Sequence, residues 1–190
     1  MPSRVLTVPS TVTTLGESAF AYSKIKNIDL KNVTTINSNC FLYANIRKVE
    51  LSDSVTYLGK YAFMYSKITE IKLGHGLSSI EEGTFAYTDL LNSIVIPNTI
   101  QVIGISAFSY SFVNTVTFEE NSSLIYFDRS SFSFSSISKL DMPDSVVLVG
   151  AEAFSNSALS ELNISDKSNL TQIGYSAFLG TPIRSVNLPN

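Results

Sequence analysis

The chain has 190 residues, a net charge of −3 and a sequence pI of about 5.1. Apolar residues make up 44% of it and charged residues 15%, which allows a packed core and excludes a disordered chain. The acidic balance argues against a nucleic-acid binder that neutralises phosphates. A single cysteine, Cys40, and a single histidine, His75, exclude an internal disulfide, a thiolate zinc site and the usual multi-histidine metal sites.

The start of the chain, residues 1–10, lacks the apolar stretch that a signal peptide needs. No apolar run approaches the roughly eighteen residues of a membrane span. We therefore expect no membrane insertion by this segment.

One unit repeats along the whole chain. Each copy carries a Phe that usually follows a small residue, and successive Phe residues are 21 to 24 positions apart. This spacing is within the range of leucine-rich repeats, about 20–29 residues. The eight repeated residues are Phe20, Phe41, Phe63, Phe85, Phe108, Phe132, Phe154 and Phe178.

Five further positions of each unit are always large and apolar. Relative to the Phe they lie at −8, −5, +5, +8 and +10, and an inserted residue displaces the last three in the fourth unit. In the first unit they are Val12, Leu15, Ile25, Ile28 and Leu30, and the last unit ends with Leu188 at +10. Residues +8 and +10 are separated by one residue, so both should point inward from a short strand while the residue between them points outward.

These units predict a leucine-rich-repeat solenoid. It would have one parallel β-sheet with one short strand per 21–24-residue repeat, and extended segments or short 3₁₀ or helical turns on the return face. Gly at position −4, as in Gly59 and Gly104, suggests a tight bend with positive φ. We expect residues 1–190 to form a single array of about eight repeats and to be a fragment of a longer protein. Ends without capping units would allow end-to-end self-association.

The repeated unit resembles the BspA-like leucine-rich repeats of bacterial and protist cell-surface proteins. The pattern is clearest in Met142-Pro-Asp-Ser-Val-Val-Leu-Val-Gly-Ala-Glu-Ala-Phe154 and in Ile96-Pro-Asn-Thr-Ile-Gln-Val-Ile-Gly-Ile-Ser-Ala-Phe108. The resemblance covers nearly the whole chain, although the family often has Cys three residues after the Phe, where this chain has Ser, Thr or Ala. It implies a location at the cell surface or outside the cell, and adhesion to host or matrix proteins.

The outward strand positions would form a patterned surface. Opposite charges stand on adjacent coils, as in Lys48 beside Glu70 and Glu50 beside Lys72. One interpretation is a mixed-charge surface that binds a protein, and the other is a set of cross-strand pairs that keep the sheet soluble and in register. The residues predicted to contact a partner are Lys48, Glu50, Glu70, Lys72, Thr117, Lys139 and Asp141.

An aromatic row stands two residues after the repeated Phe, and we name it the aromatic ridge. It is surplus to the apolar positions that fill the core, so it could be an exposed ridge that anchors a partner. It could equally be a ladder that packs coil on coil. Its members are Tyr22, Tyr43, Tyr65, Tyr87, Tyr110 and Phe134.

No motif for catalysis or cofactor binding is present in the sequence. His75 lies in Gly74-His75-Gly76 just after a predicted strand and is interpreted as a loop residue, because nothing around it suggests a catalytic triad. Cys40 occupies a position that most units fill with Ala, which indicates a small buried side chain. We therefore expect no enzymatic activity, no cofactor, no metal site and no nucleic-acid partner.

The sequence leaves two functional hypotheses. The first is a non-enzymatic protein–protein interaction module of a cell-surface or secreted adhesin-like protein, which would bind host-surface or extracellular-matrix proteins. The alternative is an intracellular leucine-rich-repeat scaffold or regulator, with which the single cysteine is compatible.

Overall fold

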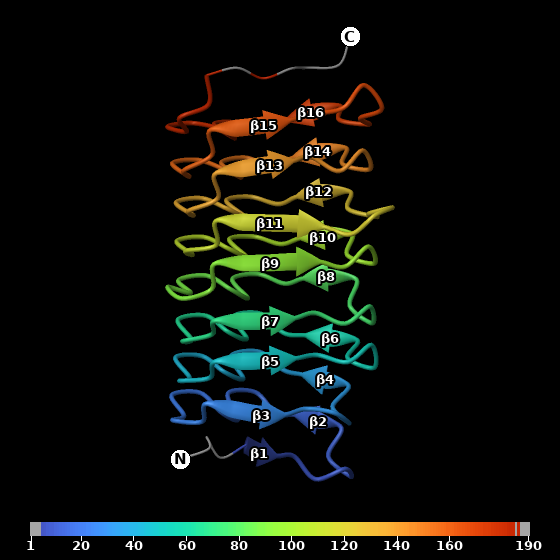
Figure 1. Cartoon of the computed structure of the whole chain (residues 1–190), viewed down its shortest axis with the longest axis vertical. Coiled ribbons are helices and arrows are strands. Elements are labelled where there is room, and N and C mark those ends of the chain that lie inside the picture. The colour runs from blue at the N-terminus through green and yellow to red at the C-terminus, as the bar shows by residue number, and fades with distance from the viewer. Residues whose placement is uncertain (1–4, 185, 187–190) are drawn as a thin grey trace.

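The computed structural model describes residues 5–184 and 186. Its chain winds into eight stacked coils, each about one repeat long (Figure 1). No helix occurs within these residues. The leucine-rich-repeat solenoid predicted from the sequence is therefore confirmed. Leu188, which was predicted to end the last strand, lies outside the described residues.

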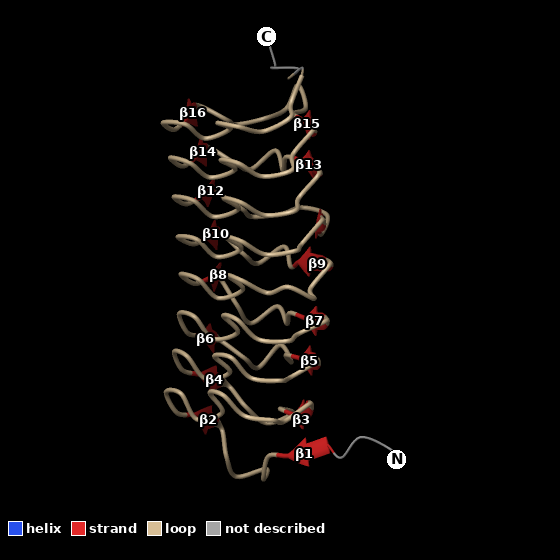
Figure 2. Ribbon diagram, turned by 90° about the vertical axis from the view of Figure 1, so that its left-hand side faces the viewer, coloured by secondary structure: helices blue, strands red, loops and turns tan. Residues whose placement is uncertain are grey.

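Two rows of short strands run along the stack. The longer strands form the strand face: β1 (Val5–Thr7), β3 (Asn27–Asp29), β5 (Lys48–Glu50), β7 (Glu70–Lys72), β9 (Ser93–Ile96), β11 (Thr115–Phe118), β13 (Lys139–Asp141) and β15 (Glu161–Asn163). Two-residue strands form the return face: β2 (Thr14–Leu15), β4 (Thr35–Ile36), β6 (Tyr57–Leu58), β8 (Ser79–Ile80), β10 (Val102–Ile103), β12 (Tyr126–Phe127), β14 (Leu148–Val149) and β16 (Gln172–Ile173). Figure 2 shows the two faces on opposite sides of the coils.

Strands of successive coils pair in parallel, as the repeat predicts. β5 pairs with β7 so that Lys48 lies beside Glu70 and Val49 beside Ile71. Successive side chains of a strand point to opposite sides of the sheet. Val49 and Ile71 are accordingly buried, whereas the residues on either side of them are exposed.

Each coil bends around its Phe through hydrogen-bonded turns. In the third coil the Ala62 N–H donates to the Gly59 carbonyl (3.3 Å), and the Ser66 N–H donates to the Phe63 carbonyl (3.0 Å). The third residues of these turns, Tyr61 and Tyr65, have φ values of 58° and 57°. A hydrogen-bonded turn with positive φ at its third residue has the pattern of a type II turn. Positions −2 and +2 around every repeated Phe share this left-handed conformation.

The conformational reason predicted for the glycines at position −4 is wrong. Positive φ among the described glycines occurs at Gly83 and Gly180 only, which are not at position −4. A Cβ added at Gly104 would instead lie 2.8 Å from the carbonyl oxygen of Ile80 in the preceding coil. Glycine at this position therefore allows the backbones of adjacent coils to approach closely.

A column of stacked Phe rings lies at the centre of the core. The six inner repeated Phe residues have no exposed surface. Their ring centroids lie between 4.7 and 5.6 Å from those of their neighbours in the column. Phe20 and Phe178, in the first and last coils, are only partly buried. Each Phe of the column is thus buried by the coils above and below it, and burial falls off at the ends.

Both rows of strands are interrupted around the fourth coil. The described strands β7 and β9 lie next to each other in the stack but do not pair, and neither do β6 and β8. The interruption is next to the one inserted residue of the fourth repeat. The Phe column continues across it, because the Phe63 N–H donates to the Thr84 carbonyl (2.9 Å) and the rings of Phe63 and Phe85 stack with their centroids 5.6 Å apart.

Candidate functional site

The structure places all seven predicted contact residues on the strand face with exposed side chains. They come from β5, β7, β11 and β13, in which each residue of the set alternates with a buried one. The positions between the two core residues of each strand point outward, as expected. The rows therefore form a regular outer surface on a scaffold whose backbone is held by the neighbouring coils.

Most charges on this face are joined in ion pairs between adjacent coils. Lys48 Nζ lies 2.6 Å from Glu70, Lys72 Nζ lies 2.7 Å from Glu50, and Lys139 Nζ lies 2.7 Å from Glu161. The hydrogen bond and the charge of Glu50 raise the pKa of Lys72, and those of Lys139 lower the pKa of Glu161. Exposed pairs of this kind contribute little to the stability of a fold, because water and salt screen their charges. The cross-strand pairing expected from the sequence is present, and it leaves the charged ends accessible to a partner.

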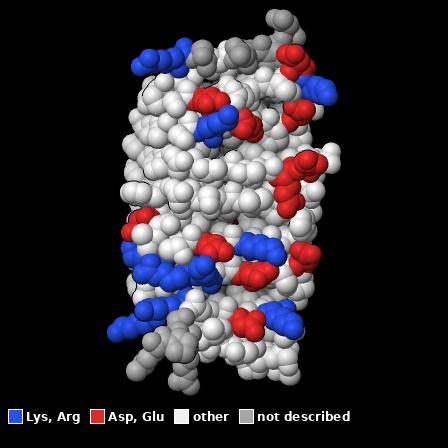
Figure 3. Space-filling model, viewed as in Figure 1, with Lys and Arg blue, Asp and Glu red and all other residues white. Residues whose placement is uncertain are grey.

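The middle of the strand face carries no charged side chain on its strands. β9 and β11 direct Ser93, Val95, Thr115 and Thr117 outward. Val95 is 52% exposed, at a position that holds Lys72 or Asp141 in other coils. Figure 3 shows an uncharged band here between two groups of charged side chains.

Two open grooves lie beside this band, where the strands end. One has a volume of about 550 Å³ and the other about 590 Å³, and Glu119 contributes to both. The smaller groove has an apolar part formed by Ile71, Leu73, Val95 and Pro97. A surface with an apolar centre and a polar rim is typical of a protein interface.

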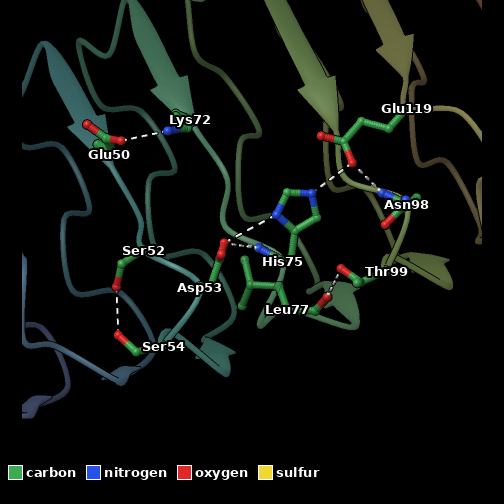
Figure 4. A network of polar contacts seen from close by, with 10 residues as sticks. All are labelled: Glu50, Ser52, Asp53, Ser54, Lys72, His75, Leu77, Asn98, Thr99 and Glu119. Carbon is green, nitrogen blue, oxygen red and sulfur yellow. Dashed lines mark hydrogen bonds and ion pairs between the residues drawn. The ribbon is translucent and has the colours of Figure 1, made fainter.

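His75 connects coils that are far apart in the sequence. Its Nδ1 lies 3.2 Å from Asp53, and its Nε2 lies 2.9 Å from Glu119, which is 44 residues further along the chain (Figure 4). Glu119 also accepts a hydrogen bond from the Asn98 N–H (3.1 Å). This network spans four successive coils beside the interruption between β7 and β9.

The two carboxylates change the protonation of His75. The pKa of His75 is raised, mostly by its hydrogen bond to Glu119 and next by its hydrogen bond to Asp53. The pKa of Asp53 is lowered, mostly by the hydrogen bond that it accepts from the backbone N–H of His75. The sequence around His75 predicts an ordinary loop residue and gives no sign of this network. No local motif signals it, because its members come from four different repeats.

The aromatic ridge is a ladder of stacked rings on the surface. Centroids of adjacent rings are 4.4 to 5.1 Å apart, with interplanar angles of 3° to 16°. Tyr22 is 70% exposed, whereas Tyr65 and Tyr87 are half-buried. Partial desolvation and the neighbouring Tyr65 raise the pKa of Tyr43. The packing interpretation is therefore correct for the ring faces, and the ring edges and hydroxyls remain available for contact.

All six ridge residues have a backbone conformation that aromatic residues rarely adopt. Their φ values lie between 53° and 58°, and the equivalent positions in the last two coils hold Asn156 and Gly180, which favour this conformation. The left-handed region costs an L-residue about 1–2 kcal/mol. A stacked aromatic pair contributes about 0.5–1.5 kcal/mol. Because these energies are similar, stacking offsets the conformational cost without a clear gain in stability.

Within residues 5–184 and 186, no three His, Cys, Asp or Glu side chains converge as a metal site would require. Burial raises the pKa of the Cys40 thiol to about 12, so it stays protonated. The part of the chain that the structure describes also has no helix with the length and apolar character needed to cross a membrane.

Comparison with known structures supports the fold. The crystal structure of the pneumococcal vaccine antigen PcpA matches with a TM-score of 0.64 and 18% identity, over 94% of this chain and 60% of that protein. A leucine-rich repeat protein from Bacteroides ovatus matches with a TM-score of 0.62 and 17% identity, over 97% of this chain and 66% of that protein. The chain thus spans less than two thirds of either structure. No curated protein shows significant similarity to it.

The family model for the BspA type leucine-rich repeat region matches in six copies, over residues 3–111 and 78–190. These two ranges together include the whole described solenoid, its Phe column and both candidate surfaces. The match agrees with the repeat spacing, the parallel strands and the resemblance of the repeated unit. The chain therefore belongs to the BspA type leucine-rich repeat family.

Proposed function

We propose that the chain is a non-enzymatic protein–protein interaction module of a cell-surface or secreted adhesin-like protein, and that it binds host-surface or extracellular-matrix proteins. The observation that carries this proposal is the strand face, where side chains stand outward in regular rows on strands fixed by their neighbours. A rigid surface loses little conformational entropy when it binds. Solenoids commonly use such extended faces for binding.

The proposed location at the cell surface is supported by the family to which the chain belongs. BspA-like repeats resemble this chain throughout, and PcpA, one of the structural relatives, is a vaccine antigen. Both facts agree with a protein that operates outside the cell. End-to-end self-association is a further part of the proposal, since the unpaired edge of a parallel sheet can pair with a strand of another chain.

The partner would dock on the strand face. Its predicted contacts are the paired charges of Lys48, Glu70, Lys139 and their neighbours, which surround the uncharged band at Val95 and Thr117. Rim charges mainly set the association rate and the salt dependence, while an apolar centre contributes more of the affinity. The aromatic ridge is the alternative docking surface.

A binding screen tests this function. The chain is passed over immobilised purified host-surface and matrix proteins, and binding is measured by surface plasmon resonance. We expect saturable binding to at least one of them, and failure to bind any would argue against the proposed partner class.

Variants of the chain then locate the contact surface. Charge reversal at Lys48, Lys72 and Lys139 should weaken binding about tenfold or more, since several favourable charge contacts become repulsive. The matched variant Tyr43→Ser with Tyr65→Ser should mainly lower stability, because both rings stack within the ridge. Binding that survives the charge reversals and is lost in folded Tyr variants would assign the site to the aromatic ridge instead.

A further inference from the structure

The structure gathers four cations at the edge where the chain enters three successive strands. Lys24 and Lys26 precede β3, Arg47 precedes β5 and Lys67 precedes β7. The Arg47 N–H donates to the carbonyl of Lys26 (2.8 Å), and Arg47 Nη1 lies 3.5 Å from the carbonyl oxygen of Lys67. We name these four residues the basic edge. Lys and Arg side chains gather in this region, at the lower left of Figure 3.

Several lysines of the solenoid are neutralised by acidic side chains of neighbouring coils. Lys48, Lys60, Lys67, Lys72 and Lys139 each form an ion pair with a carboxylate of an adjacent coil. Lys24, Lys26 and Arg47 form no ion pair with any of the described residues. Three of the four cations of the basic edge are thus not neutralised by an ion pair within the described residues, on a chain whose net charge is −3, and the fourth, Lys67, is paired with Asp89.

Two exposed rings of the aromatic ridge lie next to this cluster in the chain. Tyr22 is two residues before Lys24 and is 70% exposed, and Tyr43 is 46% exposed. Their rings stack on each other at 5.1 Å, and the other face of Tyr43 stacks on Tyr65, so Tyr43 presents its edge and hydroxyl, whereas Tyr22 has a described ring against one face. Neither groove described above includes these residues. The edge therefore suits a segment that lies along the surface better than one that inserts a side chain.

We propose that the basic edge is the docking site for an extended acidic segment of a partner protein. This deepens the proposed function and depends on it, because it names the chemistry of the partner. The carboxylates of the segment would form ion pairs with Lys24, Lys26 and Arg47. These would resemble the pairs that Lys48 and Lys67 form with carboxylates of adjacent coils. Alternate side chains of an extended chain are about 6.6–6.8 Å apart, and successive coils are about 4.8 Å apart. The long side chains of Lys and Arg can span this difference.

The test uses the chain as it is and a dye-labelled peptide of alternating Glu and Ser as the probe. Binding is followed by fluorescence anisotropy at low and at physiological salt. We expect saturable binding that weakens with salt, and a loss of about tenfold or more in Lys24→Glu with Arg47→Glu. The matched control is Lys31→Glu with Lys167→Glu. It changes the net charge by the same amount, but its residues follow β3 and β15, at the opposite ends of the strands from the basic edge. It should alter the affinity by less than about threefold.

Three results would overturn the proposal. The first is an equal loss in both double variants, which would show that net charge alone attracts the peptide. The second is an unchanged affinity in Lys24→Glu with Arg47→Glu, provided that its thermal melt shows a folded protein. The third is saturable binding of a sulfated polysaccharide together with no binding of the peptide, which would assign the edge to a glycan.

Failure here is separable from failure of the proposed function. A host protein found in the binding screen whose affinity is unchanged by Lys24→Glu with Arg47→Glu would leave the interaction module intact. It would refute the basic edge as the docking site.

Discussion

Truncation of Phe108 to Ala tests the central structural conclusion, that the Phe column holds the coils together. The ring of Phe108 has no exposed surface and lies 5.3 Å from the ring of Phe85 and 4.7 Å from that of Phe132. Loss of a fully buried Phe costs about 3–5 kcal/mol. For a chain of this size, a loss of 4 kcal/mol corresponds to a fall of about 8–16 °C in Tm.

Phe20→Ala provides a matched comparison. Phe20 is chemically identical but only partly buried, and its ring stacks on a single neighbour, Phe41, at 5.5 Å. We expect this variant to lose less than about half of the free energy of unfolding that Phe108→Ala loses, because the lost burial is smaller. The ratio between the two variants is more informative than either value alone.

Urea denaturation and thermal melts, both followed by far-UV circular dichroism, measure these losses. In a solenoid each coil is buried by its neighbours, so the loss at Phe108 should lower the stability of the adjoining coils as well. A melt of Phe108→Ala within one degree of the parent would refute the reasoning. Equal losses in the two variants would refute it too, since burial would then not determine the cost.

Three further predictions concern the coil contacts, the histidine and the ends. Gly104→Ala should destabilise the protein in urea denaturation, because the new Cβ would lie 2.8 Å from the Ile80 carbonyl oxygen, whereas Gly16→Ala, with nothing within 4 Å, should be neutral or slightly stabilising. The pKa of His75 is raised in the folded state, so its bridge should stabilise fully below its unfolded value of 6.5 and be lost as pH rises through the folded pKa. Unfolding measured between about pH 6 and 8 should lose this dependence in His75→Gln, and an unchanged pH profile would contradict it. Hydrogen exchange should be faster in the first and last described coils than in the third to sixth, and uniform protection in a monomer would contradict this.

The periodicity of the sequence determined the fold almost completely. Repeated Phe and aliphatic residues recur at a fixed spacing, and a coil of that length can bury them only against copies of itself. The outward positions followed from the same pattern, since the residue between two inward ones in a strand must face solvent. The prediction of stacked rings at Tyr43 and Tyr65 follows likewise, because equivalent positions in a solenoid stand above each other.

The glycines show where local reasoning failed. The sequence predicted that Gly104 is needed because its φ is positive. The structure shows instead that a side chain at this position would come too close to the backbone of the preceding coil. Positive φ instead falls on residues such as Tyr65, whose type gives no local sign of it. Local preference was overridden at these positions by hydrogen bonds between coils, such as that from the Tyr65 N–H to the Ala86 carbonyl (3.1 Å).

Contacts between non-adjacent coils were decided by the tertiary structure alone. His75 and Glu119 are 44 residues apart in the sequence and belong to coils that are not adjacent. Their side chains form a hydrogen bond across the coil that lies between them. The basic edge arises in the same way, since Lys24, Arg47 and Lys67 are dispersed along the sequence and come together only where successive coils enter their strands. A repeat pattern fixes the height and face of each residue in the stack. The direction of a long polar side chain depends on the charges that the neighbouring coils place around it, and these vary from one copy to the next.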